Sequence, residues 1–310
     1  MVQTDVLSGL CPACGEKLKV PAHLKQFSCM YCGARLTPSE LRSEQPAAAE
    51  QSIDAEGCAA YYKAHVLEAI TNYPGIEKEM TRSGYTPAFE RFTLGNSEIF
   101  RQMDLAVTAH ALDLDEAVCY FLDQLDAHWD AKASWKQSRN TLLETDKFII
   151  AIFLVPMIRS MKLSTSEAYC QKLQETWVQR YPKYPFFLGT YEEMTSGFQK
   201  RFFGLCFITT AICAFENKPD DCAELTAFRA FRDGYLRSCP DGPALIEEYY
   251  DVAPGIVLRL ELSHDRDARY TYLRDNYLKP CYADLQAGRL AQCKDRYVSM
   301  VRSLEQEFLS

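Results

Sequence analysis

Four cysteines near the start of the chain have the spacing of a metal site. They form two Cys-x2-Cys pairs with fourteen residues between the pairs, and a glycine follows each pair: Cys11, Cys14 and Gly15, then Cys29, Cys32 and Gly33. Two cysteines at this spacing can turn both sulfur atoms toward one ion, and the glycine permits the tight turn that this needs. Four thiolates leave no open coordination position, so the spacing predicts a structural Zn²⁺ site that takes no part in catalysis.

The segment that carries these cysteines, residues 1–40, is too short to fold by burying apolar surface alone. Metal binding is worth roughly 10–16 kcal/mol in modules of this kind, so we expect the ion to fold the segment. With its two cysteine pairs, the segment resembles a zinc ribbon. Its basic side chains can offset the negative charge of a zinc–tetrathiolate centre: Lys17, Lys19, Lys25 and Arg35.

Zinc ribbons bind protein partners, cap a domain or contact nucleic acid, so this resemblance leaves the partner open. Nucleic-acid binding usually needs a basic face with exposed aromatic side chains. Residues 1–45 carry five Lys or Arg against four Asp or Glu, and Phe27 and Tyr31 could either stack on bases or form the core of the ribbon. The near balance of charge favours a protein partner and leaves nucleic acid as the alternative.

Five more cysteines, all in the C-terminal third, could form a thiol cluster: Cys206, Cys213, Cys222, Cys281 and Cys293. A second metal site, a redox pair and a nucleophile are the functional interpretations. Buried apolar packing, which free cysteine does well, is the favoured one. A nucleophile needs a base, and the histidine nearest in sequence is His264. A thiol-dependent enzyme or redox sensor that uses Cys206 therefore stays an alternative, and no catalysis is assigned.

A charged group on a predicted helix near residue 230 also has two interpretations. Arg229 and Asp233 are four residues apart and are expected to pair, which leaves Arg232 to reach another carboxylate such as Glu247 or Glu248. The arginines could form a pocket for a carboxylate or phosphate, because guanidinium presents a bidentate fork. A partly buried ion pair that fixes the helix register is favoured, since no glycine-rich loop stands beside the group.

The stretch 206–257 is similar to the bacterial CFI-box domain, which is named for its Cys-Phe-Ile start. The resemblance rests on these positions: Cys206, Phe207, Ile208, Thr210, Ala211, Leu225, Phe231, Arg232, Asp233, Gly242, Tyr249, Tyr250 and Pro254. The longer run to residue 310 resembles the extended form found in Firmicutes, which follows a zinc ribbon in the same order. The resemblance implies this architecture and a bacterial cytoplasmic origin, and it implies no particular reaction.

Apolar residues recur at helical spacing from about residue 55 to the end of the chain. The last helix has the clearest stripe: Leu290, Cys293, Tyr297, Val301, Leu304 and Phe308. This stripe predicts core packing, with a coiled-coil seam in an oligomer as the weaker alternative. Pro254 is expected to begin a further helix, and no internal repeat of 20–50 residues is evident.

The fold class is therefore all-α, with a helical bundle or a two-layer helical body behind a small N-terminal zinc ribbon. The predicted parts are a ribbon, a linker, a helical domain and a CFI-box helical domain: residues 1–40, 41–54, 55–195 and 196–310.

The bulk composition is that of a folded soluble protein, and residues 1–10 lack the basic run and apolar core of a signal peptide, so we expect the chain to stay in the cytoplasm. The 310 residues are 47% hydrophobic and 25% charged, and the formal net charge of −8 disfavours non-specific binding to nucleic acid or to an anionic membrane. Residues 148–158 are apolar but too few to cross a bilayer, and they predict a buried helix. In that reducing compartment the thirteen cysteines are ligands or thiols. We expect a zinc-binding protein that acts through protein–protein contacts.

Overall fold

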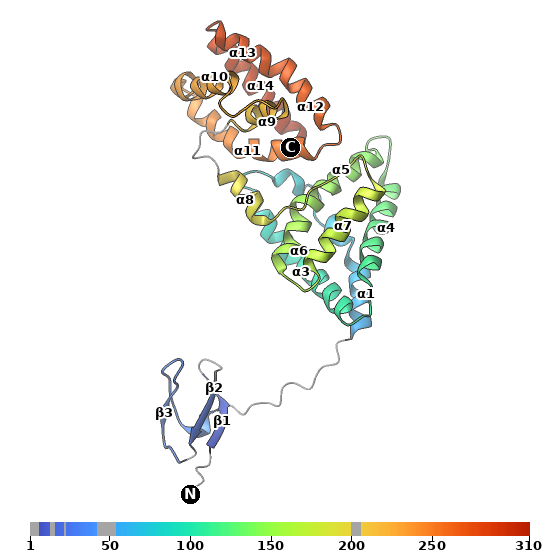
Figure 1. The fold of residues 1–310 in the computed structure, drawn as a ribbon, viewed down its shortest axis with the longest axis vertical. Helices are drawn as coiled ribbons and strands as arrows, with labels where there is room; N and C mark the ends of the chain where they lie inside the picture. Colours follow the sequence, from blue (N-terminus) through green and yellow to red (C-terminus); the bar gives the residue numbers. More distant parts are fainter. Residues whose placement is uncertain (1–5, 13–15, 22, 42–53, 200–205) are drawn as a thin grey trace. The chain divides into compact units, whose positions relative to one another are not determined.

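The computed structural model describes residues 6–12, 16–21, 23–41, 54–199 and 206–310. The chain divides into two compact units, residues 1–54 and residues 55–310, and each is described by itself (Figure 1). The predicted linker lies almost wholly outside the described residues, so its structure is left aside. The predicted boundary at residue 196 stays a prediction.

The N-terminal unit is built from two short antiparallel hairpins. Strand β1 (Val6–Leu10) pairs with β2 (Lys17–Pro21), and β3 (Phe27–Ser28) pairs with β4 (Arg35–Leu36). A single 3₁₀ turn, η1 (Pro38–Glu40), follows β4. Cys11 directly follows β1, and Cys29 and Cys32 lie in the connection between β3 and β4. The buried apolar residues of this unit are few: Cys11, Leu18, Cys29 and Leu36 form its cluster, together with Val20, which is also buried.

The second unit is helical, which confirms the predicted all-α class. Its first half contains these elements in order: α1 (Ala55–His65), α2 (Glu68–Thr71), η2 (Ile76–Glu79), α3 (Tyr85–Thr108), α4 (Leu114–Lys132), α5 (Arg139–Ile149), η3 (Ile150–Leu154), α6 (Val155–Met161), α7 (Ser166–Arg180) and α8 (Tyr191–Gln199). Helix α1 packs on α3, and α7 packs on both α4 and α6. Asp113 caps α4 by accepting hydrogen bonds from the backbone of Asp115 and Glu116.

Large aromatic side chains fill the core of this first half. Trp129 and Trp177 are fully buried, and their rings meet edge to face with centroids 6.0 Å apart. Trp129 donates its indole N–H to Asp146 over 2.7 Å, which satisfies a buried polar group inside the cluster. Every residue from 148 to 158 is buried, as predicted for this apolar segment.

The second half of the helical unit holds its own apolar cluster. Its elements are α9 (Phe207–Phe215), α10 (Ala223–Phe231), η5 (Arg232–Leu236), α11 (Gly242–Leu262), α12 (Arg266–Leu273), η6 (Arg274–Leu278), α13 (Lys279–Gln286) and α14 (Leu290–Leu309). The predicted stripe of α14 packs into this cluster, with Cys293, Val301 and Leu304 buried. The apolar stripe of α14 is therefore buried within a single chain. A coiled-coil seam in an oligomer is not needed to bury it.

Pro254 lies inside α11, so the prediction that it begins a helix is wrong. A proline can stay in a helix when other groups satisfy the nearby backbone, and here the loop before α3 does so. The backbone N–H of Arg82 donates to the carbonyl of Asp251 at 2.9 Å, and that of Ser83 donates to the Asp251 carboxylate at 2.9 Å. A Cβ atom on Gly255 would lie 1.8 Å from the Met80 carbonyl oxygen. The proline–glycine pair therefore lets this loop dock against α11.

Within the described residues, no helix is both long enough and apolar enough to cross a membrane.

Candidate metal centre and the Arg232 pocket

Three of the four predicted ligands converge in the N-terminal unit. The Sγ atoms of Cys11, Cys29 and Cys32 all lie within 4.8 Å of one another. Cys11 and Cys29 are buried and Cys32 is exposed. The fourth predicted ligand, Cys14, lies outside the described residues. Across the described part of the chain, this is the one group of three or more potential metal ligands that meets this criterion.

The spacing of these sulfur atoms fits a tetrahedral ion. With metal–sulfur bonds of about 2.3 Å, the edge of a sulfur tetrahedron is about 3.8 Å. The Sγ atoms of Cys11 and Cys32 are 3.8 Å apart. The three cysteines could therefore hold a metal without rearrangement, with a vertex of the tetrahedron left for a fourth thiolate.

The hairpin turns place these sulfur atoms. The backbone N–H of Cys29 donates to the Ala34 carbonyl, and the N–H of Gly33 donates to the Cys29 carbonyl, at 2.8 and 2.9 Å. Gly33 has a φ of 75°, a left-handed conformation that glycine adopts at little cost. An equivalent hydrogen bond closes the turn of the first hairpin, where the backbone N–H of Cys11 donates to the backbone carbonyl of Glu16 over 2.9 Å.

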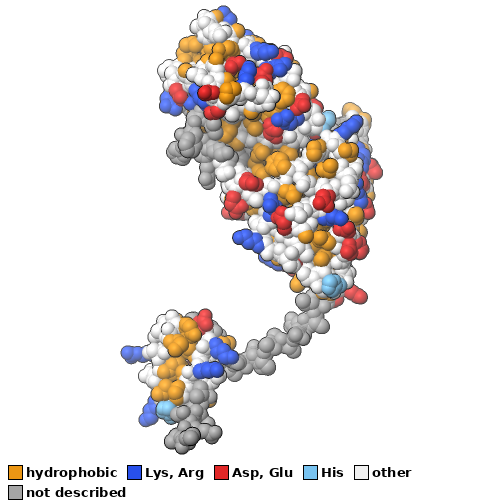
Figure 2. Space-filling view, in the orientation of Figure 1, with side chains coloured by type: hydrophobic (Ala, Val, Ile, Leu, Met, Phe, Trp, Pro, Cys, Tyr) orange, Lys and Arg blue, Asp and Glu red, His pale blue; other side chains and the backbone are white. Residues whose placement is uncertain are grey.

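Large apolar side chains project from the second cysteine pair. Met30 is 81% exposed and Tyr31 is 61% exposed, and both lie between the candidate ligands Cys29 and Cys32. Tyr31 is therefore not part of the ribbon core. Strand β2 alternates exposed lysine with buried apolar residues. Figure 2 shows Lys and Arg side chains at the edges of this unit around an apolar stripe.

The five C-terminal thiols separate instead of forming one cluster. Two of them pair across α13 and α14, where the Cys281 thiol donates to the Cys293 carbonyl over 3.8 Å. Burial, and then the neighbouring Cys222, raises the pKa of Cys213 to about 12. A hydrogen bond from Cys281, and then burial, raises the pKa of Cys293. Cys213 and Cys293 are therefore protonated thiols near neutral pH, in keeping with apolar packing.

Cys206 stands apart from both pairs, beside Arg232. The guanidinium of Arg232 lies 3.7 Å from the Cys206 Sγ atom and donates to the hydroxyl of Tyr250 over 3.0 Å. Burial raises the pKa of Cys206, and the positive charge of Arg232 offsets that rise only in part. The thiol is thus the stable form at neutral pH. His264 shares a hydrogen bond with Glu144 over 2.8 Å and lies against the ring of Tyr184.

The predicted ion pairs around residue 230 are wrong in their partners. Arg232 binds the adjacent Asp233 in a bidentate manner, at 2.9 and 2.7 Å. Arg229 instead binds Asp220 over 2.7 Å. Element η5 is a π-helical turn that begins at Arg232, so residues four apart across its start no longer share a face. The two carboxylates that were predicted as partners of Arg232 form ion pairs with other arginines. Glu247 pairs with Arg82, and Glu248 pairs with Arg302.

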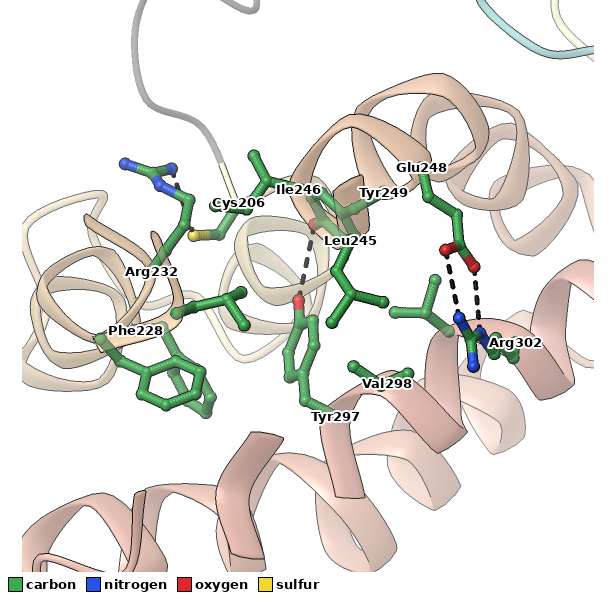
Figure 3. A pocket seen from close by; sticks show the side chains of 13 residues that line it. Cys206, Phe228, Arg232, Leu245, Ile246, Glu248, Tyr249, Tyr297, Val298 and Arg302 are labelled. Carbon is green, nitrogen blue, oxygen red and sulfur yellow. Dashed lines mark hydrogen bonds and ion pairs between the residues drawn. The ribbon is translucent and has the colours of Figure 1, made fainter. Parts of the chain in front are cut away.

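A small cavity of about 60 Å³ lies beside Cys206 and Arg232 (Figure 3). Its walls come from α10, η5, α11 and α14 and are almost entirely apolar. Tyr297 reaches across it, with its hydroxyl 3.0 Å from Thr209 and 3.5 Å from Tyr249. Tyr249 in turn accepts the backbone N–H of Ile208 over 3.0 Å. The polar groups thus bind one another, and the cavity offers no reactive constellation.

A short repeat accompanies the Arg232 site. Residues 231–239 and 273–281 share Arg, Asp, Tyr, Leu and Cys at matching positions, forty-two residues apart. Both arginines begin a π-helical turn, η5 or η6, and both lie bidentate on the following aspartate. Arg274 is the second of them. The repeat is nine residues long, which is shorter than the repeats of 20–50 residues that the sequence was expected to lack.

Comparisons with protein families, with curated proteins and with solved structures gave no match.

Proposed function

We propose that the N-terminal unit binds one zinc ion and uses it to hold a docking surface for a protein partner. The observation that carries the proposal is the convergence of the Cys11, Cys29 and Cys32 sulfur atoms within 4.8 Å. A tetrahedral all-thiolate shell suits zinc or iron. Zinc is favoured because a closed site with a structural role needs no redox activity.

The docking surface consists of Met30 and Tyr31, on the turn between two of the ligands. Tyrosine and methionine are enriched at protein interfaces, and an exposed tyrosine on a rigid turn makes an effective anchor. The metal supplies that rigidity, because it fixes the cysteines on both sides of the pair.

The charge of the unit supports a protein over a nucleic acid. The described part carries four basic side chains, at residues 17, 19, 25 and 35, against Glu16 and Glu40. A zinc ion with four thiolates has two net negative charges, which would cancel this excess. A nearly neutral surface gains little from releasing counterions of a phosphate backbone.

The resemblance to the CFI-box domain supports a second part of the proposal. On that resemblance, residues 196–310 form the CFI-box domain of a bacterial cytoplasmic protein, joined to a zinc-dependent adaptor. No reaction is proposed.

The test combines metal analysis with partner capture. The purified chain should contain one equivalent of zinc. Crosslinking in cell extract, read by quantitative mass spectrometry, should identify a protein that the M30S/Y31S variant loses. The variant Leu94→Ser is the matched control, because Leu94 is also exposed but lies on α3 of the helical unit.

A purified candidate partner must then bind the intact chain and lose affinity for M30S/Y31S and for the zinc-free protein. Equal binding to all variants would contradict the proposal. Nuclease-sensitive recovery, with steep salt dependence of binding to single-stranded nucleic acid, would instead assign the surface to nucleic acid.

A further inference from the structure

Arg259 is a half-buried cation of the helical unit, and no described carboxylate lies within ion-pair distance of it. It lies on α11, and its guanidinium carbon stacks 3.7 Å from the centre of the Phe148 ring of α5. Its Nε atom is fully buried and has no hydrogen-bond partner. No hydrogen bond or ion pair joins Arg259 to any other residue that the structure describes. Of the five N–H donors of the guanidinium, only the one on Nε is buried without a partner, and those on the two terminal nitrogens remain accessible.

The physical cost of this arrangement indicates a missing partner. A buried donor that lacks an acceptor costs about 1–3 kcal/mol, and more when the donor is charged. Burial lowers the pKa of Arg259 to about 10, although Glu77 and then Glu144 oppose the change. Native proteins rarely leave such a group unpaired, so a water or an anion is expected beside it.

The neighbouring charges do not supply the partner. Glu144 accepts the backbone N–H of His264 over 2.9 Å and lies 3.8 Å from the Lys147 ammonium. Lys147 also donates to the carbonyl of Leu262. Glu77 is buried and its Oε2 atom lacks a partner, but it lies beyond ion-pair distance of Arg259. Among the described residues, neither Glu144 nor Glu77 therefore pairs with the Arg259 guanidinium.

A cavity of about 70 Å³ lies where such an acceptor would sit. Arg259, Lys147 and Glu144 line its polar side, and Phe148, Leu262 and Phe308 line its apolar side. A further cation at its edge, Arg269, is already bound to Asp265 and Glu307, each over 2.6 Å. One water needs about 10–15 Å³ by this measure, so the cavity has room for roughly five heavy atoms.

We propose that this cavity binds a small monocarboxylic acid in its ionised form. The carboxylate would accept the two-pronged hydrogen bond of the Arg259 guanidinium, and the short alkyl body would lie against Phe148, Leu262 and Phe308. A single negative charge fits because Arg259 is the only cation of the cavity wall without a carboxylate partner. A phosphate dianion would place a second negative charge beside Glu144, and the other two cations of the wall, Lys147 and Arg269, already have carboxylate partners.

The site joins the two halves of the helical unit. Its walls come from α5 in the first half and from α11 and α14 in the second. A ligand that binds only the folded form raises stability, so occupancy should strengthen this junction.

The experiment titrates the intact protein with formate, acetate, propionate, butyrate and inorganic phosphate at constant ionic strength. Isothermal calorimetry and the melting temperature are the readouts. We expect a saturable isotherm and a rising melting temperature for at least one carboxylate, and none for phosphate. Arg259→Gln should weaken that affinity about ten- to hundredfold. Arg302→Gln, which removes an exposed arginine of α14, should leave it unchanged.

The Glu77→Gln variant distinguishes a bound anion from a bridging water in the cavity, and it leaves Arg259 unchanged. Removal of the only other nearby unpaired charge should tighten carboxylate binding. The proposal is overturned if neither the wild-type protein nor this variant shows saturable binding of any of the carboxylates, because the cavity then holds water. It is also overturned if phosphate binds as tightly as the carboxylates, or if Arg302→Gln weakens binding as much as Arg259→Gln.

Discussion

The N-terminal unit and the helical unit reach a folded state by different physical means. The first has a core of four clustered residues, two of which are cysteines of the candidate metal centre. The second buries complete tryptophan, tyrosine and phenylalanine side chains in two apolar clusters. Burial of apolar surface stabilises a large unit, whereas a unit of some forty residues needs a cross-link or a metal. The ribbon is therefore expected to depend on its ion, and the helical unit is not.

The largest expected effect comes from removing a ligand. Cys29→Ser takes away a buried thiolate, and with it metal-binding free energy of roughly 10–16 kcal/mol that also folds the unit. We expect loss of zinc and loss of the ribbon amide signals in a ¹H–¹⁵N NMR spectrum, with the signals of the helical unit unchanged. Cys58→Ser is the control, because Cys58 is a buried cysteine of α1. The proposed contrast between the two units fails if the protein keeps its zinc after both substitutions.

A substitution in the aromatic core is expected to lower the stability of the helical unit alone. Trp177 is fully buried against Trp129, Tyr181 and Phe186. Trp177→Ala should lower the free energy of unfolding of this unit by about 3–5 kcal/mol, through lost burial and a cavity. Denaturant unfolding followed by circular dichroism measures this, and zinc content should not change. Trp135→Ala, at a side chain 90% exposed, should have little effect.

The repeated Arg–Asp pair sharpens the comparison within the helical unit. Arg232→Gln leaves Asp233 and the Tyr250 hydroxyl without their cation, and we expect a loss of about 2–3 kcal/mol in unfolding free energy. The half-exposed Asp233 carboxylate keeps the figure below that of a fully buried pair. The matched substitution Arg274→Gln should cost less, because the Arg274 side chain is 23% exposed against 11% for Arg232, which also binds the hydroxyl of the buried Tyr250. Equal losses would show that burial does not distinguish the two pairs.

A pH-dependent contribution is expected from Asp146. Burial, helped by the nearby Glu77, raises the pKa of Asp146 to about 6 despite the hydrogen bond from Trp129. The folded state thus holds a proton that the unfolded state releases at a lower pH, near the ordinary aspartate pKa of 3.8. Stability from this group is present below that lower value and is lost as pH rises through about 6.

Asp146→Asn tests the sign of this effect. The amide oxygen can still accept from Trp129 but carries no charge, so the variant should gain about 2 kcal/mol over the wild type between pH 4 and pH 7. Denaturant melts at several pH values measure the difference. A difference that stays constant with pH, or that reverses sign, would rule out a raised pKa at Asp146.

Much of the fold was predictable because helices leave a periodic pattern. The apolar stripe of α14 and the apolar run at residues 148–158 were predicted to be buried, and the structure buries them. The metal centre was predictable in the same way, because ligand spacing within a turn is a local property. Cys14 is the part of that prediction that lies outside the described residues.

The ion pairs and the Arg259 cavity were not predictable from local patterns. A π-helical turn shifts the register after Arg232, and nothing in the spacing of Arg229 and Asp233 reveals it. The nine-residue repeat could have predicted that residues 232–236 and 274–278 adopt the same kind of turn. Arg259 carries no motif at all. Its lack of a partner results from the packing of α5 on α11, which depends on residues more than a hundred positions apart.

Stepwise chelation of the intact protein tests the central claim most directly. Zinc release would be quantified while ¹H–¹⁵N NMR spectra follow both units in the same sample. We predict that the ribbon signals collapse as a single equivalent of zinc leaves, and that the melting transition of the helical unit stays where it was. Ribbon signals that persist in metal-free protein would contradict the account.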